Sequence, residues 1–502
     1  MTRYRLAARA AALAAALWLA GLACSRSGVP LPIRNLPLPF VDSVPSGPTA
    51  FQPLASARRT PTPDPVRASL NLAPHPASYA VQPGDTLGAI AVRFGVSLAA
   101  LQARNPTLDP SRLEIGQHVE IPMPDSEQPG PSYKIIPDSE LVFGPGAMDF
   151  DIQGFVDSQG GYLATYGSTV DGRDRSGAEI VELVSQRYSV NPRLLLAVLE
   201  YTGGWVTNRS PSAFRQGFPI VYLSGRDGLY RQLTWAANEL NRGFYSWRAG
   251  GSDYWTFGDG SAVRAGPGIN AGTAAVQQLM AQLFSRGEWE RAVGEQGLFA
   301  TYETFFGYPF DWAFEPLVPP DLTQPELRLP FENGHTWYFT GGPHGAWDTG
   351  SAWGALDFAP GSVPLGCSTS SDWVVAAAPG LIVRSDEGAV VQDLDGDGHE
   401  QTGWVIFYMH IASHDRVPFG KYLQTGDRIG HPSCEGGVST GTHLHLARKF
   451  NGEWIAADGA LPFAIGGWIS AGLGREYDGT LSHGGTRMEA CECRASSNAI
   501  TP

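Results

Sequence analysis

The spacing of apolar positions changes abruptly after a proline-rich stretch and predicts a small β-α-α-β module over residues 78–123. The pattern of residues 79–82 indicates a short strand, and a Pro-Gly turn with a following Asp-Thr pair starts a helix. Apolar residues at helical spacing continue this helix to Phe94, and a second helix is expected from Ser97 to Asn105. Alternation over residues 113–122 closes the module with a strand.

Helical periodicity dominates residues 130–320, which are also rich in aromatic residues. Apolar positions recur at helical spacing from Ala178 to Tyr188. The Ser-Val-Asn-Pro that follows supplies a cap and a proline for the next helix, which is expected from Leu194 to Tyr201. We therefore expect a mostly helical domain here.

Strand-like patterns return in the last third of the chain. Residues 404–410 form an apolar run that ends in a histidine, and residues 443–448 alternate between polar and apolar side chains. A shorter run, Ala355–Asp357, places an aspartate at the end of a strand. These patterns predict a β-sheet domain over residues 331–480 with a polar tail over residues 481–502. The whole chain is thus predicted to be a multidomain α+β protein.

The first residues have the composition of an export signal. Three arginines precede the apolar run 10–23, which is short for a bilayer span. Small residues before Cys24 resemble a bacterial lipoprotein processing site, although the nearby leucine lies one position later than usual. Residues 1–24 are therefore predicted to be a signal peptide with lipidation at Cys24. Ordinary signal cleavage with an incidental cysteine is the alternative.

A linker is expected between this segment and the first module. Residues 25–77 contain 12 of the 39 prolines and no periodic apolar pattern. This composition predicts an extended, partly polyproline chain, which at roughly 3.1 Å per residue could reach on the order of 100 Å. Such a reach suits a protein that is anchored at a membrane and acts at a distance from it.

Composition and charge narrow the classes of function. With 43% hydrophobic and 17% charged residues, the 502-residue chain is expected to form several globular domains. A formal net charge of −14 argues against a nucleic-acid partner, because phosphate-binding proteins normally carry a basic face. Export lets disulfides persist, so we expect Cys367 to pair with Cys434, whereas Cys491 and Cys493 stay unassigned.

The first module, with VQPGDTL at its first turn and IGQHVEIP at its closing strand, resembles a LysM domain over its whole length. The resemblance implies binding to N-acetylglucosamine-containing glycans in a shallow groove. Gly84, Asp85 and Thr86 would lie at one side of that groove, with Asn105 and Pro106 opposite. The alternative is that these residues only cap helices.

Within the helical region, the segment SVNPRLLLAVLEYTGGW is similar to the opening of lysozyme-like transglycosylase domains, where a helix delivers a catalytic glutamate. Aligned on the Gly-Trp pair, Thr202 occupies the glutamate position, and threonine cannot act as the general acid of glycoside cleavage. Glu200 lies about 200° around the helix from that position, so it would point elsewhere. A lysozyme-like but non-catalytic domain is therefore expected.

Nine of the 11 histidines lie in the last third of the chain. His443 and His445 belong to one predicted strand and share a face, because alternate residues of a strand point the same way. Both imidazoles can therefore approach one metal ion. His410 ends another predicted strand, and upstream a Gly-Pro-His segment with His344 precedes Asp357.

This order of histidines and aspartate resembles the lysostaphin/LytM family of zinc endopeptidases. The segments VVAAAPGLIV and LQTGDRIGHPSCEGGVSTGTHLH also resemble that family, and the likeness extends over residues 331–465. The resemblance implies a small antiparallel β-sheet domain with its site in a groove.

The resemblance also implies the roles of five residues. His344, Asp357 and His445 would ligate Zn²⁺ and leave a coordination position open for water. His443 would be the general base, and His410 would stabilise the oxyanion or shuttle the proton.

One departure from the family concerns the first two ligands, which the family usually spaces by four residues. His344 and Asp357 are 13 residues apart, whereas Asp348 satisfies the shorter spacing. We favour Asp357 because the Phe-Ala-Pro-Gly that follows it matches the family. Residues 345–356 would then form an insertion beside the groove.

Two other groups of polar residues receive a structural interpretation. Asp393-Leu-Asp-Gly-Asp397 resembles the first half of a calcium loop, but Trp404 stands where an EF-hand has glutamate. An acidic hairpin is therefore expected, with calcium as the alternative. The other histidines of the last third are expected to be surface or loop residues rather than ligands: His335, His399, His414, His431 and His483.

Together, these patterns predict an exported zinc metalloendopeptidase that cleaves peptide bonds in peptidoglycan. The LysM domain would hold it on the cell wall, and a lipid would anchor it to the membrane that faces the wall. The alternative is a non-catalytic envelope protein that binds peptidoglycan and regulates other cell-wall hydrolases. Retention of all five site residues favours the enzyme.

Overall fold

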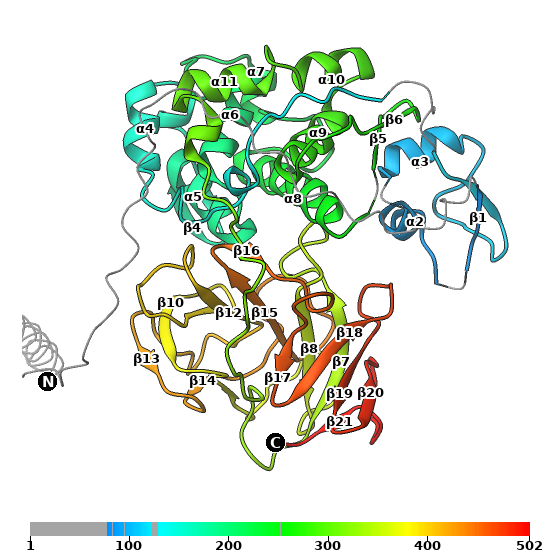
Figure 1. Ribbon diagram of the computed structural model, residues 1–502, viewed down its shortest axis with the longest axis vertical. Helices are drawn as coiled ribbons and strands as arrows, with labels where there is room; N and C mark the ends of the chain where they lie inside the picture. Colours follow the sequence, from blue (N-terminus) through cyan, green and yellow to red (C-terminus); the bar gives the residue numbers. More distant parts are fainter. Residues whose placement is uncertain (1–77, 83, 95, 123–128, 252) are drawn as a thin grey trace, which may run out of the picture. The chain divides into compact units, whose positions relative to one another are not determined.

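The computed structural model describes residues 78–82, 84–94, 96–122, 129–251 and 253–502 (Figure 1). The expected signal peptide, Cys24 and the proline-rich linker lie outside these ranges. Within the described ranges, no helix has both the length and the apolar character that a membrane crossing needs.

The first module has the β-α-α-β order that its sequence predicts. Its elements are β1 (Ser78–Ala80), α2 (Leu87–Arg93), α3 (Leu98–Arg104) and β2 (His118–Glu120). β1 and β2 pair antiparallel, with Tyr79 opposite Val119. The side chain of Ser97 caps α3 by accepting a hydrogen bond from the N–H of Ala100. Both helices and both strands contribute to one apolar core.

The middle of the chain is mostly helical. Its helices are α4 (Ile152–Gln159), α5 (Gly177–Tyr188), α6 (Pro192–Gly203), α7 (Ala213–Gly217), α8 (Leu229–Arg248), α9 (Ala271–Leu283), α10 (Arg286–Ala292) and α11 (Leu298–Phe306). Two hairpins interrupt them, β3 (Gly167–Val170) with β4 (Arg173–Ser176), and β5 (Tyr254–Thr256) with β6 (Ala262–Arg264).

Caps set the boundaries of the two helices that were expected here. Ser176 and Glu179 form a reciprocal capping box at the start of α5. Asn191 caps α6 and Pro192 occupies its first turn, while Gly204 ends it in the left-handed conformation with a φ of 62°. Both helices begin slightly before the expected positions, because the periodicity of apolar residues does not include the capping turn.

The C-terminal region is built on one large antiparallel sheet, in which β16 (Glu453–Trp454) pairs only with β15. In spatial order its other strands are β13 (Tyr422–Leu423), β10 (Gly380–Asp386), β11 (Ala389–Asp393), β12 (Trp404–Met409), β15 (Leu444–Phe450), β8 (Ala355–Pro360), β7 (Trp337–His344) and β21 (Ala499–Ile500).

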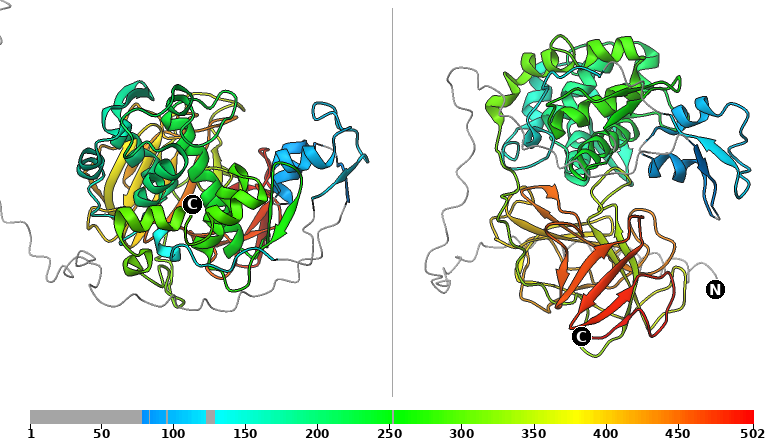
Figure 2. Two further views of the ribbon diagram at one scale, coloured as in Figure 1. Left: turned by 90° about the horizontal axis from the view of Figure 1, so that it is seen from above. Right: turned by 45° about the vertical axis from the view of Figure 1, so that its right-hand side comes forward.

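Two smaller sheets complete this region. One, coloured orange to red in Figure 2, consists of β17 (Ala464–Ile465), β18 (Trp468–Gly472), β19 (Gly479–His483) and β20 (Thr486–Glu489). The other pairs β9 (Val374–Val375) with β14 (Arg428–Gly430).

The expectation of a polar tail over residues 481–502 is wrong. β20 pairs with β19, and β21 pairs with β7 at the edge of the large sheet. Met488 and Ile500 are buried, so this segment has enough apolar side chains to join the fold despite its polar composition.

The sequence of β12 is continuously apolar and does not alternate, because this strand is buried on both faces. Val405, Phe407 and Met409 belong to the core that also contains the helical region, whereas Ile406 and Tyr408 belong to the core on the opposite face. A strand that is buried on both faces has no polar position to alternate with.

Polar contacts also join the sheet to the helices. The N–H of Trp454 donates a hydrogen bond to the hydroxyl of Tyr245, over 3.0 Å. Next to it, Arg248 of α8 forms an ion pair with the buried Glu453, with 3.2 Å between nitrogen and oxygen. The helices and the large sheet therefore share one buried interface.

Candidate metal centre

Three adjacent strands bring His344, Asp357 and His445 together. β15, β8 and β7 are neighbours in the sheet, and His445 lies directly opposite Asp357 in the antiparallel register. His344 is the last residue of β7. Asp357 lies inside β8 and not at its end as expected, because the strand continues through Phe358, which pairs with Leu444.

The side chains of these three residues converge. Asp357 Oδ1 lies 3.3 Å from Nε2 of His344 and 3.3 Å from Nδ1 of His445. The two histidine nitrogens are 3.0 Å apart. One nitrogen or oxygen from each residue lies within 4.8 Å of the others, so the group could hold a metal ion.

Backbone carbonyls fix how both histidines present their nitrogens. His344 donates from Nδ1 to the carbonyl oxygen of Gly342 over 2.8 Å, and His445 donates from Nε2 to that of Ala346 over 3.0 Å. A carbonyl can only accept, so these two nitrogens carry the hydrogen. In the neutral rings, Nε2 of His344 and Nδ1 of His445 therefore face Asp357 with free lone pairs, as in metal-ligating histidines.

The burial, hydrogen bonding and charge of Asp357 indicate whether a cation fits beside its carboxylate. Its Oδ1 is buried and has no hydrogen-bond partner, and a buried carboxylate oxygen without a partner is costly. Burial raises the pKa of Asp357, but His344 and His443 outweigh burial and hold it well below its usual range. Burial lowers the pKa of His344, yet the neighbouring carboxylate outweighs it and the pKa is raised. Two imidazoles and one ionised carboxylate are a donor set that zinc prefers.

A glycine gives Asp357 its room. Gly341 of β7 lies directly opposite Asp357, and a Cβ at this position would come within 2.7 Å of Asp357 Oδ2. Any side chain on Gly341 would therefore displace the carboxylate. In the sequence, the only sign of this close approach is the Gly-Gly pair at 341 and 342, shortly before His344.

His443 and His410 lie beside the three converging residues. His443 directly precedes β15; it donates from Nδ1 to the carbonyl of Gly441 over 2.7 Å and holds Nε2 3.6 Å from Asp357 Oδ1. His410 follows β12 and donates from Nδ1 to the carbonyl of Glu435 over 3.0 Å. The two ring centroids are 4.4 Å apart. Burial, together with His443 and His445, lowers the pKa of His410 to about 3, so it is neutral near pH 7.

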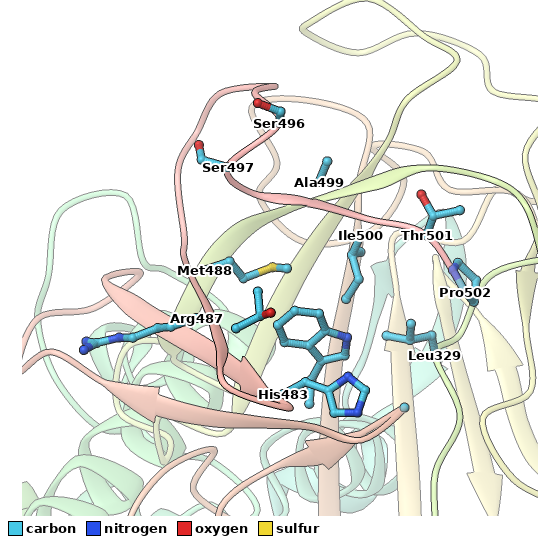
Figure 3. Close-up of a pocket in the computed structure, with 13 residues that line it drawn as sticks. Leu329, His483, Arg487, Met488, Ser496, Ser497, Ala499, Ile500, Thr501 and Pro502 are labelled. Carbon is cyan, nitrogen blue, oxygen red and sulfur yellow. The ribbon is translucent and has the colours of Figure 1, made fainter.

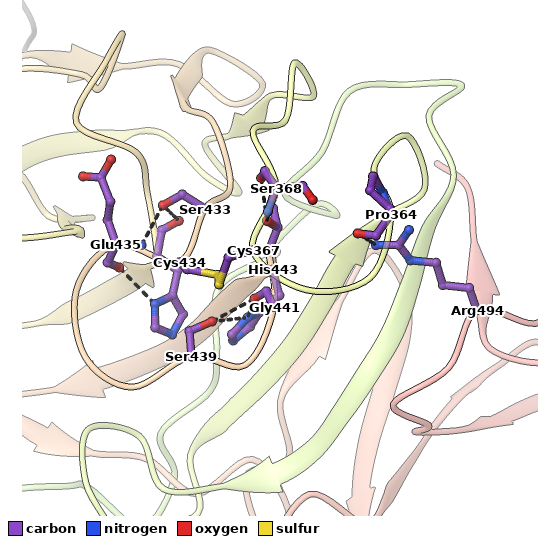
Figure 4. Close-up of a disulfide and its surroundings, with 12 residues drawn as sticks. Pro364, Cys367, Ser368, Ser433, Cys434, Glu435, Ser439, Gly441, His443 and Arg494 are labelled. Atoms are coloured by element: carbon purple, nitrogen blue, oxygen red, sulfur yellow. Dashed lines mark hydrogen bonds between the residues drawn. A yellow bond between two sulfur atoms is a disulfide. The ribbon is translucent and has the colours of Figure 1, made fainter.

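A disulfide joins the loops around these two histidines (Figure 4). The Sγ atoms of Cys367 and Cys434 are 2.06 Å apart. The hydroxyl of Ser433 and the carbonyl of Glu435, on either side of Cys434, both hydrogen-bond to His410. Cys491 and Cys493, which the sequence left unassigned, are bonded to each other in the structure.

Sequence reasoning missed two residues at the centre. The ring of Tyr477 stacks on His344 with 4.2 Å between centroids, and burial followed by Asp357 raises its pKa to about 12. Glu476 accepts a hydrogen bond from the N–H of Gly345 over 3.3 Å. Both residues lie in the turn between β18 and β19, more than 100 residues after His344, and no local pattern links that turn to the site.

Asp348, the alternative ligand, lies elsewhere. It accepts a hydrogen bond from the hydroxyl of Tyr188 in α5 over 3.0 Å and is not a member of the converging group. The loop that contains it contacts α8 as well, because Asn238 accepts from the N–H of Gly350 over 2.8 Å. The loop therefore joins the site to the helical region.

Three of the proposed glycan-binding residues form hydrogen bonds within the first module. Asp85 accepts hydrogen bonds from Tyr79 and Gln82, each over 2.7 Å, and Thr86 caps α2. Asn105 bonds to the backbone of Glu120 in β2. Gly84 has a φ of 85°, and it is exposed, as are Thr86 and Pro106. Glycan contact by these residues stays a prediction.

The carboxylate of Glu200 in the helical region binds two residues that follow α6. It accepts hydrogen bonds from the N–H groups of Val206 and Thr207 and from the hydroxyl of Thr207. Thr202 donates to the carbonyl of Val198 one turn earlier. The absence of glycoside cleavage by this region stays a prediction.

Among the residues that the structure describes, two more groups could hold a metal ion. Asp393, Asp395 and Asp397 bring one oxygen each within 4.8 Å of one another, and calcium at this loop stays an open alternative. His414, Asp415 and His431 form the other group. His431, expected to be a surface or loop residue, lies in the loop that follows β14 and is 7% exposed.

Figure 3 shows a cavity of about 470 Å³ in the C-terminal region. Leu329 and residues between 466 and 502 line it, among them Trp468, His483 and Arg487. None of the five candidate site residues lines it.

Two family models match parts of the chain. Residues 79–122 match the model described as LysM domain, and residues 134–319 match the model described as LasA, N-terminal domain. The second match covers the helical region, so its resemblance to lysozyme-like domains is not confirmed.

Several proteins with similar sequences are named as proteases. Protease LasA of Pseudomonas aeruginosa (strain UCBPP-PA14) is 25% identical over 346 residues, which are 64% of this chain and 75% of that protein. Beta-lytic metalloendopeptidase of Achromobacter lyticus is 28% identical over 166 residues, 31% of this chain and 41% of that protein. Among solved structures, the M23 metalloprotease pseudoalterin from the deep sea is 26% identical with a TM-score of 0.28, covering 34% of this chain and 96% of that one. The sequence relatives and the LysM match support a metallopeptidase with a LysM domain.

Proposed function

We propose that this protein is an exported zinc metalloendopeptidase that hydrolyses peptide bonds in peptidoglycan. The observation that carries the proposal is the convergence of His344 Nε2, His445 Nδ1 and Asp357 Oδ1, with the other ring nitrogens tied to backbone carbonyls. The relatives named above are proteases of the same general kind, and the LysM domain supports peptidoglycan as the substrate.

His344, Asp357 and His445 would hold the zinc ion. A bound zinc ion would lower the pKa of a water molecule and polarise the scissile carbonyl group. The stacked Tyr477 and the carbonyls of Gly342 and Ala346 keep the two imidazoles in place.

His443 is assigned as the general base. Its Nδ1 donates to Gly441, so Nε2 carries the lone pair and faces the converging group. His410 has the same arrangement, with Nδ1 donating to Glu435. Neutral His410 therefore offers a lone pair at Nε2 that can accept a hydrogen bond, and its low pKa makes it a weak base.

Export and targeting belong to the same proposal. The disulfide between Cys367 and Cys434 suits an oxidising compartment. The predicted signal peptide and lipidation at Cys24 would place the protein at the membrane surface that faces the wall. The LysM domain would then hold the enzyme on the glycan strands.

The experiment is release of free amino groups from purified peptidoglycan by the full chain, with and without a zinc chelator. We expect amine release that the chelator abolishes and added zinc restores. Release of reducing sugar instead of amines would contradict a peptidase. No release by folded protein that is shown to hold zinc would favour the alternative, a non-catalytic protein that binds peptidoglycan and regulates other hydrolases.

A further inference from the structure

A second cluster of possible metal ligands lies on the C-terminal region, and the proposed peptidase chemistry does not use it. His414, Asp415 and His431 bring one ligand atom each within 4.8 Å of one another. The rings of His414 and His431 are nearly parallel, at 21°, with centroids 5.1 Å apart. Nε2 of His431 lies 3.8 Å from Oδ2 of Asp415.

The surroundings of His431 fix its orientation. Its Nδ1 donates a hydrogen bond to the carbonyl oxygen of Asp372 over 2.8 Å, so Nε2 carries the lone pair in the neutral ring. Trp373 packs against the ring with 3.9 Å between centroids. The histidine side chain is only 9% exposed, and its free nitrogen faces Asp415. A backbone carbonyl behind the ring is the arrangement that orients histidines toward metals.

The backbone brings the other two residues over this nitrogen. The N–H of Ala412 donates to the carbonyl of His431 over 2.8 Å, and the N–H of Val417 donates to that of Ile429 over 2.7 Å. Between these two hydrogen bonds the chain forms a short turn that contains His414 and Asp415. Asp415 has a φ of 56°, a conformation that few non-glycine residues adopt. This turn keeps its carboxylate, which is 67% exposed, open to solvent.

We propose that His414, Asp415 and His431 form a second metal site, which binds a divalent transition-metal ion such as zinc. Two imidazoles and one carboxylate are borderline ligands that suit zinc better than calcium or magnesium, and water would complete the shell. The site differs from the candidate catalytic centre in that two of its residues are exposed, so a bound ion would exchange with solvent.

A bound ion would link two chain segments that contact residues of the candidate metal centre. One segment continues directly from His410, and the other leads directly to Cys434, whose neighbours contact His410. The second site would therefore stabilise the loop that positions His410 without contacting substrate.

The test counts zinc ions bound by the full chain, after removal of metals and titration with zinc against a chromophoric chelator. We expect two zinc ions per wild-type chain and one after His431→Ala. Because His431 is buried, the exposed pair His414→Ala with Asp415→Ala is tested as well, and it should also leave one. The matched control is His483→Ala, an exposed histidine of the same region, which should leave two. Equal stoichiometry in the wild type and both ligand variants would overturn the proposal.

A second measurement separates this site from the catalytic one. In a His445→Ala chain, added zinc should still raise the thermal unfolding midpoint, because the second site remains. Adding His414→Ala and Asp415→Ala to that chain should abolish the shift. If zinc stabilises both chains equally, or neither chain, the second site does not exist. This readout needs no peptidase activity, so it stands even if the proposed function fails.

Discussion

The backbone carbonyl of Ala346 accepts a hydrogen bond from Nε2 of His445 over 3.0 Å, and this bond points the other ring nitrogen toward Asp357. Ala346 lies in the loop that follows His344, and the helical region holds that loop. Tyr188 donates to Asp348 in it. A proposed metal ligand on the sheet is thus oriented by a loop whose position depends on helices elsewhere in the chain.

Substitution of Gly350 by alanine should weaken zinc binding at the candidate metal centre. A Cβ on Gly350 would lie 2.0 Å from the carbonyl oxygen of Asn238 in α8, so the loop has to move. Loss of an outer contact to a metal-ligating histidine typically costs about 10- to 100-fold in affinity. We expect a loss of that order, measured by chelator competition in chains that also carry His414→Ala.

The matched control is Gly287→Ala, because nothing lies within 4 Å of a Cβ at that position. Its zinc affinity should equal that of the parent chain. Unchanged affinity in Gly350→Ala would show that the loop does not orient His445.

The sequence predicts the parts of the centre that depend on local pattern. Alternation in the segment after residue 442 predicts that His443 and His445 point to the same side. The residues that follow Asp357 match the family and distinguish it from Asp348. Capping residues likewise locate α5 and α6 to within two residues of their ends.

The remaining features depend on contacts between distant segments. The carbonyl partners of the histidines lie on loops whose paths follow from packing and not from periodicity. Tyr477 reaches His344 from a turn between two later strands, and His431 is buried because Trp373 covers it. No single segment contains the information for such pairings, so a reading of one sequence cannot find them.

Two aspartates near the first histidine should differ in their effect on metal binding. Asp357→Asn removes the charge from the converging group, and we expect zinc affinity at this site to fall more than about 100-fold, together with loss of amine release. Asp348→Asn keeps an oxygen that accepts the bond from Tyr188, so its affinity and activity should stay near those of the wild type. Zinc titration of both variants in the His414→Ala chain measures the difference. Equal losses in the two variants would contradict the assignment of Asp357.

A buried ion triad on the sheet should make stability depend on pH. Oε1 and Oε2 of Glu400 each lie 3.1 Å from a nitrogen of Arg384, and Nζ of Lys449 lies 3.1 Å from Oε2. Burial raises the pKa of Glu400, but the two cations outweigh it and lower the pKa to about 2. A carboxyl whose folded pKa is lowered stabilises the fold above its unfolded pKa of about 4.3 and loses this contribution as the pH falls toward 2.

Glu400→Gln should therefore destabilise the protein at pH 7 by roughly 3 kcal/mol, and the difference from the wild type should shrink below about pH 4. Thermal unfolding midpoints of both proteins at pH 7 and pH 3 measure it. Glu489→Gln, at an exposed position of β20, is the control and should change neither midpoint. A difference that does not depend on pH would mean that the loss comes from packing and not from charge.

The two disulfides should differ in their effect on stability and activity. Cys367 and Cys434 are separated by 67 residues in sequence, whereas Cys491 and Cys493 are separated by 2. A cross-link stabilises chiefly by restricting the unfolded chain, and the restriction grows with the length of the closed loop. Replacing Cys367 and Cys434 by serine should therefore cost about 2–4 kcal/mol. The same change at Cys491 and Cys493 should cost much less.

The first pair of substitutions should also slow amine release, because Cys434 lies between Ser433 and Glu435, which both hold His410. Denaturation midpoints and release rates of the two double-serine variants measure these effects side by side. Thiol titration of the unfolded, unreduced wild-type chain supplies the reference, and it should find neither Cys367 nor Cys434 free. If both of these cysteines react with the thiol reagent, the disulfide does not form. If the bond forms and the two double variants behave alike, the loop around Cys434 is held by its hydrogen bonds alone.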